Sequence, residues 1–247
     1  MKENIKFLGV SMHPWTMQET IEEIAHRLDE GVFTQHVVVN VAKLVNSQND
    51  NFLRESIDSC HIINIDGTGV VWGGRLVGHD IPERVAGIDM FFELLSLASR
   101  RLEPVYLLGA QPEIIKETVE KLRITFPELK IAGWHHGYFW DDEAAMAEEI
   151  MRSGATMLFV AISTPKKELF ITRWRDKLGV KFAMGVGGTF DIVSGKTKRA
   201  PKLMQNFGLE WFYRVLQEPR RMWKRYLFTN TKFMFLLIKE ITGKIFK

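Results

Sequence analysis

Short apolar runs alternate with longer amphipathic stretches along the first 195 residues of the chain. This alternation is typical of a parallel β-sheet whose two faces are covered by helices. The apolar runs predict strands at residues 35–39, 61–65, 105–108, 130–134, 157–161 and 181–186. We therefore expect an α/β fold, a Rossmann-like parallel sheet flanked by helices.

Local signals mark two helices between these strands. Thr16 and Glu19 have the spacing of a capping box, which predicts a helix from there to about Gly31. Pro112 predicts the start of another helix, which should run to about Thr125. Ligands of open α/β sheets bind at the carboxyl ends of the strands. The chain places polar or glycine-rich clusters at such ends, namely at residues 40, 66–69, 109, 135–138, 163–165 and 187–188.

The sheet-like pattern stops after residue 200, and aromatic, basic helical stretches follow. We therefore expect a core of residues 1–200 and a C-terminal helical appendage of residues 201–247 that associates with membranes. The segment 214–247 has nine Lys or Arg against two Asp or Glu, in a chain whose formal net charge is only +3. A tail of this charge should face phosphates, anionic lipid or nucleic acid.

The aromatic side chains of the appendage allow two interpretations. Rings interleaved with basic side chains suit a membrane interface, but the same rings could simply pack the last helices onto the core. No run approaches the roughly 18 apolar residues of a spanning helix, and the first ten residues lack the apolar run of a signal peptide. We expect a cytoplasmic protein, peripheral on the inner face of the membrane, and exposed rings leave a homo-oligomer open.

Two side chains are candidates for catalysis. Asp66 ends a predicted strand and precedes two glycines, so its carboxylate could stand free at the sheet edge. Apolar surroundings would raise its proton affinity and suit it to act as a general base, whereas a turn aspartate would bond its own backbone. Arg84 could hold a phosphate, or pair with Glu83 or Asp89 on the surface.

Other polar or glycine-rich positions suggest binding more than catalysis. The glycine turns at residues 109 and 187–188 let a ligand approach backbone N–H groups. The first lacks a complete GxGxxG motif, which argues against a nicotinamide-dependent oxidoreductase. His135 and His136 have no third ligand at metal spacing, which argues against zinc. Cys60 is the single cysteine and is expected to be a buried, inert residue.

Taken in order, these motifs resemble those of the WecG/TagA/CpsF glycosyltransferases over nearly the whole chain. The matching segments are residues 37–45 around Asn40, then 66–69, 82–87, 136–139, 164–168, 185–191, 198–201, 208–213 and 218–221. The resemblance implies an inverting, metal-independent transferase that needs no cofactor. Such an enzyme moves a hexose or N-acetylhexosamine, most plausibly N-acetylmannosamine or its uronic acid, from a UDP-sugar to an undecaprenyl-diphosphate-linked sugar. Its product would enter surface polysaccharide or teichoic acid.

The resemblance also implies roles for individual residues. Asp66 would deprotonate the acceptor hydroxyl, while Arg84, Arg214 and Arg221 would neutralise diphosphate charge. The appendage would close over the active site on an anionic membrane surface. The residues expected to bind substrate are Asn40, Gly109, Tyr138, Lys167, Gly187, Gly188 and Asp191.

The chain departs from the family pattern at two positions. Some members carry a threonine where this chain has Val38, so a hydroxyl is missing there. Lys167 replaces the usual glutamine, which could match a more acidic substrate or only rearrange a hydrogen bond. An alternative class, a non-enzymatic nucleotide- or nucleic-acid-binding module, would use the same basic residues, and retention on RNA in place of anionic vesicles would favour it. If the chain is a glycosyltransferase, we expect it to bind no nucleic acid.

Overall fold

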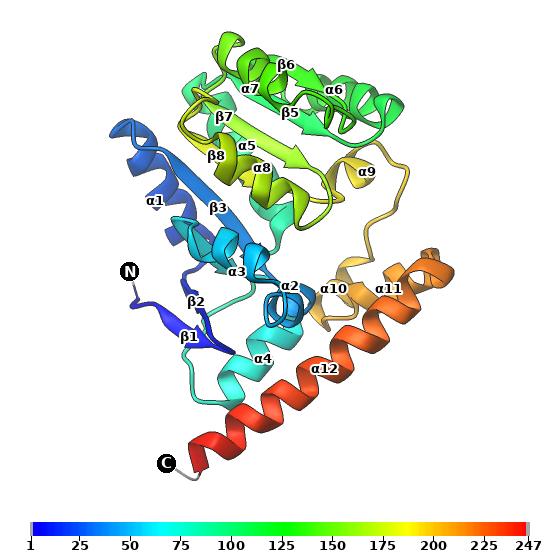
Figure 1. The fold of residues 1–247 in the computed structure, drawn as a ribbon. Helices are drawn as coiled ribbons and strands as arrows, with labels where there is room; N and C mark the ends of the chain where they lie inside the picture. The colour runs from blue at the N-terminus through cyan, green and yellow to red at the C-terminus, as the bar shows by residue number, and fades with distance from the viewer. Residues whose placement is uncertain (1, 246–247) are drawn as a thin grey trace.

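The computed structural model describes residues 2–245, with the side chains of all of these except 206, 221, 244 and 245. In that part of the chain, six parallel strands form one sheet in the order β4-β3-β8-β7-β5-β6 (Figure 1). The strands are β3 (Thr34–Val39), β4 (Ile62–Ile65), β5 (Val105–Gly109), β6 (Ile131–His135), β7 (Met157–Ala161) and β8 (Phe182–Gly185). The predicted α/β fold with a parallel sheet is confirmed.

Helices cover both faces of the sheet because alternate residues of each buried strand point to opposite sides. In β3, Val38 packs into one apolar cluster, while Val37 and Val39 pack into another on the other face. The first face is covered by α1 (Met17–Asp29), α5 (Gly87–Arg101), α6 (Pro112–Thr125) and α9 (Thr189–Val193). The second is covered by α2 (Val41–Asn46), α3 (Asn51–Asp58), α4 (Thr68–Leu76), α7 (Glu143–Arg152) and α8 (Lys166–Trp174).

The local helix signals are confirmed. Thr16 and Glu19 form the predicted capping box of α1, although the helix ends at Asp29 and not near Gly31. Pro112 lies in the first turn of α6, which ends at Thr125 as expected. Cys60 is buried, and desolvation raises the pKa of its thiol to about 12, so the thiolate is scarce at neutral pH.

A short N-terminal hairpin, not predicted from the sequence, protects one edge of the sheet. It consists of β1 (Ile5–Phe7) and β2 (Val10–Met12), strands too short to give a clear alternation of apolar and polar residues. The following His13 pairs with the edge strand β4: its backbone N–H donates to the Ile63 carbonyl over 2.8 Å, and its Nδ1 accepts from the Ile63 N–H over 3.0 Å. The edge is thereby partly capped.

Up to residue 245, the core is followed by the helices α10 (Lys202–Asn206), α11 (Glu210–Gln217) and α12 (Pro219–Ile245). Figure 1 shows α12 as a long orange-to-red helix that crosses α2 and α4. Phe233 and Leu237 of α12 are buried in the same apolar cluster as Phe7 and Val39 of the core. None of the helices in residues 2–245 is long and apolar enough to cross a bilayer.

Two glycines permit this close docking. A Cβ on Gly73 of α4 would lie 3.0 Å from the Phe233 ring, and one on Gly208, before α11, would lie 2.4 Å from Thr68 Oγ1. Gly208 also has a φ of +71°, which favours glycine. Among the aromatic side chains of the appendage, Phe233 packs in the core, whereas Trp223 and Phe228 are exposed.

A chain of buried polar side chains lies between β3, β4 and α1. His36 Nε2 lies 2.8 Å from Asn64 Oδ1, and Asn64 Nδ2 donates to Thr20 Oγ1 over 3.0 Å. Asn64 thus turns its oxygen toward His36, so Nε2 carries the imidazole proton. A second proton would enter at Nδ1, which has no hydrogen-bond partner among the described residues. Burial, opposed by the Asn64 contact and assisted by the Lys43 charge, lowers the pKa of His36 to about 4.

This depressed pKa predicts acid sensitivity of the fold. The unfolded chain takes up a proton at His36 near pH 6.5, whereas the folded chain resists it down to about pH 4. The contribution of neutral His36 to the free energy of unfolding is therefore complete above pH 6.5. This contribution, about 3 kcal/mol, is lost as the pH falls toward 4. We expect the free energy of unfolding, measured by urea titration, to fall less over this range in His36→Gln than in the wild type. Parallel pH profiles would contradict this assignment.

Candidate active site

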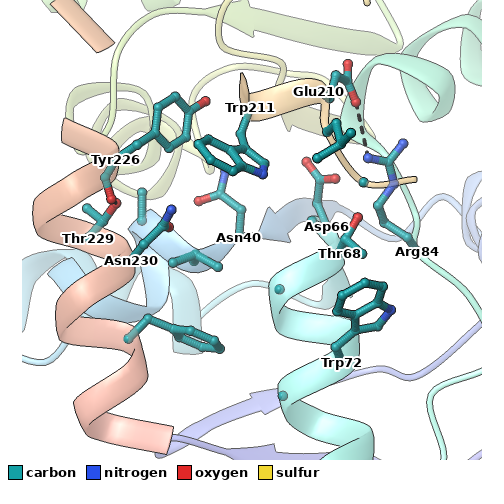
Figure 2. Close-up of a pocket in the computed structure, with 18 of the residues that line it drawn as sticks. Asn40, Asp66, Thr68, Trp72, Arg84, Glu210, Trp211, Tyr226, Thr229 and Asn230 are labelled. Carbon is teal, nitrogen blue, oxygen red and sulfur yellow. Dashed lines mark hydrogen bonds and ion pairs between the residues drawn. The ribbon is translucent and has the colours of Figure 1, made fainter. Parts of the chain in front are cut away.

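A cavity of about 780 Å³ lies at the carboxyl ends of β3 and β4, between α4 and the helices α11 and α12 (Figure 2). Of the predicted site residues whose side chains the structure describes, Asn40, Asp66, Arg84 and Arg214 line it. Asn40 and Asp66 come from neighbouring parallel strands, and Arg214 comes from α11. The cavity therefore has one wall from the core and one from the appendage.

Asp66 is positioned by the end of β4. Its N–H donates to the Val39 carbonyl over 2.9 Å, which continues the β3–β4 pairing by one residue. Gly67 then turns the chain with a φ of +88°, and α4 begins at Thr68. Because the turn directly follows the strand, the Asp66 side chain faces the cavity (Figure 2).

The electrostatic environment of Asp66 suits a proton acceptor. Burial raises the pKa of its carboxyl, and the nearby negative charge of Glu210 raises it further. The charges of Arg84 and Arg214 and the Gly67 N–H oppose this shift without cancelling it. A half-buried carboxylate with raised proton affinity can take a proton from a hydroxyl more readily than an ordinary aspartate.

An ion-pair chain joins the core to the appendage beside Asp66. Arg84 Nη1 lies 3.1 Å from Glu210 Oε2, at the start of α11 (Figure 2). Arg199 Nε lies 3.7 Å from Glu210 Oε1, and its two terminal nitrogens donate to Asp89 over 2.6 and 2.7 Å. The sequence-based pairing of Arg84 with Glu83 or Asp89 is therefore wrong, because Glu83 accepts from the Met17 N–H and Asp89 is held by Arg199.

Asn40 has a structural role as well as a place in the cavity. It is the N-cap of α2, where its Oδ1 accepts from the Lys43 N–H over 3.1 Å. This bond fixes the side chain at the junction of β3 and α2. Val38 is buried and lies against Gly87, so packing explains its branched side chain.

Lys167 lies in a buried charged cluster and does not line the cavity. The ammonium groups of Lys167 and Lys43 each lie 3.0 Å from Glu168 Oε1. The Lys167 ammonium group also donates to Thr164 Oγ1. Burial lowers the pKa of Lys167 to about 8, whereas the two ammonium groups outweigh burial and lower the pKa of Glu168 to about 2. Gly185 makes room for Lys167, since a Cβ there would lie 2.7 Å from its side chain.

Five other predicted binding residues lie at the same sheet edge but outside the cavity lining. Gly109 is explained by packing, because a Cβ would lie 2.4 Å from the Ala161 carbonyl oxygen. Tyr138 is exposed after β6, and Asp191 lies 3.4 Å from the Lys196 ammonium group. Gly187 and Gly188 form the turn between β8 and α9. The Arg221 side chain lies outside the described residues.

The sequence reasoning missed several cavity residues. These are Trp72 on α4, Glu210 on α11, and Tyr226, Thr229 and Asn230 on α12 (Figure 2). The α12 residues share one helical face with Met222 and Phe233, a period of three or four that is visible in the sequence. Nothing in that period says which core element the face covers. In residues 2–245, no group of three or more His, Cys, Asp or Glu is arranged to hold a metal ion.

A basic carboxylate beside arginines, at the carboxyl edge of a parallel sheet, suits a transferase that deprotonates an acceptor next to an anionic group. Comparison with known proteins makes this class specific. The model of the glycosyl transferase WecG/TagA/CpsF family matches residues 5–245, and the chain belongs to that family. It is accordingly a glycosyltransferase.

Two relatives have the same descriptive name, N-acetylglucosaminyldiphosphoundecaprenol N-acetyl-beta-D-mannosaminyltransferase. The chain is 36% identical to the protein of Bacillus subtilis (strain 168) over 219 residues, which cover 89% of this chain and 84% of the relative. It is 40% identical to the protein of Bacillus spizizenii (strain ATCC 23059 / NRRL B-14472 / W23) over 171 residues, which cover 69% of this chain and 66% of the relative.

Proposed function

We propose that this glycosyltransferase moves N-acetylmannosamine, or a closely related sugar, from a UDP-sugar to N-acetylglucosamine on undecaprenyl diphosphate. The observation that carries the proposal is the position of Asp66 in a cavity beside Arg84 and Arg214, in a chain similar to two relatives named for this acceptor. The product would enter a cell-surface polysaccharide or teichoic acid.

In the proposed reaction, the Asp66 carboxylate takes the proton of the acceptor hydroxyl. The hydroxyl oxygen attacks the anomeric carbon of the donor sugar on the face opposite the nucleotide. The bond between that carbon and the phosphate oxygen breaks, and UDP leaves with the electron pair. Attack from the opposite face inverts the anomeric configuration. Arg84 and Arg214 would stabilise diphosphate charge near the reacting atoms.

We place the nucleotide along the carboxyl ends of β8, β5 and β6, which follow β3 across the sheet from the cavity. Tyr138 is exposed there, and the turn at Gly187 and Gly188 can bring backbone N–H groups close to a phosphate. The acceptor would enter from the appendage side, where Arg225 adds to the cationic lining. Asp66 would then lie between the two substrates.

We further propose that α12 rests on the inner face of the cell membrane. Trp223, Leu227 and Phe228 are exposed on this helix, and Lys232 lies 4.3 Å from the centre of the Phe228 ring. Rings that enter the headgroup region beside ammonium groups favour an anionic membrane surface. Such contact would bring the cavity to a lipid-linked acceptor.

The test is a donor panel. Several UDP-sugars are incubated with the full-length protein and N-acetylglucosamine linked by diphosphate to a short prenyl chain, and release of UDP is measured. We expect rapid release from UDP-N-acetylmannosamine, much slower release from its C2 epimer, and little release without acceptor. Acceptor-independent release from every donor, or none from any, would contradict the proposal. Binding of the protein to RNA in place of anionic vesicles would favour the nucleic-acid module.

A further inference from the structure

The cavity has two ends of opposite character. Around Asp66 its lining includes the polar or cationic residues Asn40, Thr68, Arg84, Arg214 and Arg225, with Glu210 and Trp211 beside them. One turn farther along α4, and two turns farther along α12, the lining becomes apolar. We call this end the α4–α12 groove; it consists of Trp72, Gly73, Leu76, Phe233, Met234 and Leu237. Figure 2 shows Trp72 projecting from α4 below Thr68, with α12 opposite.

The groove has a closed floor and open walls. Phe233 and Leu237 are each only 5% exposed and form part of the core, whereas Trp72 is 65%, Leu76 68% and Met234 52% exposed. From Phe233 to Leu237 the groove follows α12 for about 6 Å. Exposed apolar side chains in a concave site are hydrated, and this hydration is unfavourable in free energy. An apolar ligand that covers them would displace the water.

The residues next to the groove indicate which ligand it binds. It is continuous with a site that contains Arg84, Arg214, Arg225 and the Asp66 carboxylate, so one ligand with a diphosphate joined to an apolar chain can fill both ends. A membrane surface alone would be met by outward-facing rings such as Phe228 and does not require an apolar channel next to Asp66. A second copy of the chain, if it docked on the groove, would not need the arginines at the Asp66 end of the cavity.

We infer that the α4–α12 groove binds the first isoprene units of the polyprenyl diphosphate acceptor while the rest of the chain stays in the bilayer. This inference rests on the proposed function, because it assumes that acceptor. It makes Trp72, Leu76 and Met234 residues that select a prenyl chain, and it places the acceptor diphosphate between the groove and Asp66.

The test uses soluble probes and needs no turnover. Binding of pyrophosphate, dimethylallyl diphosphate and farnesyl diphosphate to the full-length protein is measured by calorimetry, without vesicles and below the micelle concentration. We expect farnesyl diphosphate to bind at least tenfold more tightly than pyrophosphate, since each buried methylene adds to affinity. Met234→Glu should abolish this gain and leave pyrophosphate affinity within about twofold of the wild type.

A neighbouring residue supplies the matched control. Phe235 is 70% exposed on the same helix and does not line the cavity, so Phe235→Glu should keep the full chain-length gain. Trp72→Ala should lose most of it, with Phe52→Ala on α3 as its control. Equal affinity of the wild type for all three probes, or equal losses in Met234→Glu and Phe235→Glu, would overturn the inference. If farnesyl diphosphate binds more tightly than pyrophosphate but the protein transfers no sugar, the groove still binds a prenyl chain and the proposed function is refuted.

Discussion

Asp66→Asn is expected to lower kcat by a factor on the order of a hundred or more, which is the usual worth of a general base. Asparagine has nearly the shape of aspartate but cannot accept the acceptor proton. Donor binding, measured by calorimetry with UDP, should change little. The fold should remain intact, because the substitution removes a charge whose burial is unfavourable. Unchanged turnover in this variant would remove Asp66 from the mechanism.

The pH profile gives a second readout of the same residue. Only the deprotonated carboxylate can act as base, and burial raises the pKa of Asp66, so kcat/KM should fall with decreasing pH at a higher pH than for an ordinary aspartate. Glu210→Gln removes a negative charge that also raises this pKa, and should move the acidic limb to lower pH. If the acidic limb of kcat/KM lies at the same pH in the wild type and in Glu210→Gln, a group other than Asp66 is responsible for that limb.

Much of the core was predictable because its strands are short and continuously apolar. The run around β7, for example, is buried at every residue from Met157 to Ala161, and such runs between amphipathic stretches favour a parallel sheet. Asn40 and Asp66 were predictable as neighbours for the same reason, since the carboxyl ends of adjacent parallel strands meet at one edge.

The partner of Arg84 could not be predicted in this way. Glu210 is 126 residues farther along the chain, whereas Glu83 and Asp89 are close in sequence, and a charged side chain carries no sequence signal of a distant partner. The same limit applies to the α4–α12 groove. The period of α12 indicates an amphipathic helix, but only the docking of Phe233 against Gly73 decides that its face covers α4.

That docking makes α12 part of the site and of the core at once. Phe233 packs edge-on against the Phe7 ring, with 6.3 Å between ring centres, and touches Gly73 of α4. On the same helix, Tyr226, Thr229 and Asn230 line the cavity. The helix α12 therefore shares its apolar contacts with the core: its release would uncover part of that core and remove one wall of the site.

Phe233→Ala is accordingly expected to reduce activity by more than tenfold without unfolding the sheet. Loss of a buried phenylalanine costs about 3 kcal/mol, and here the loss falls on the contact that holds α12 to α4. Backbone amides of α12 should exchange hydrogen much faster, while those of β5 and β7 keep their protection. Phe235→Ala, an exposed site two residues away, should change stability by less than about 0.5 kcal/mol and leave exchange unaltered. Equal exchange in the two variants would mean that other contacts hold the helix in place.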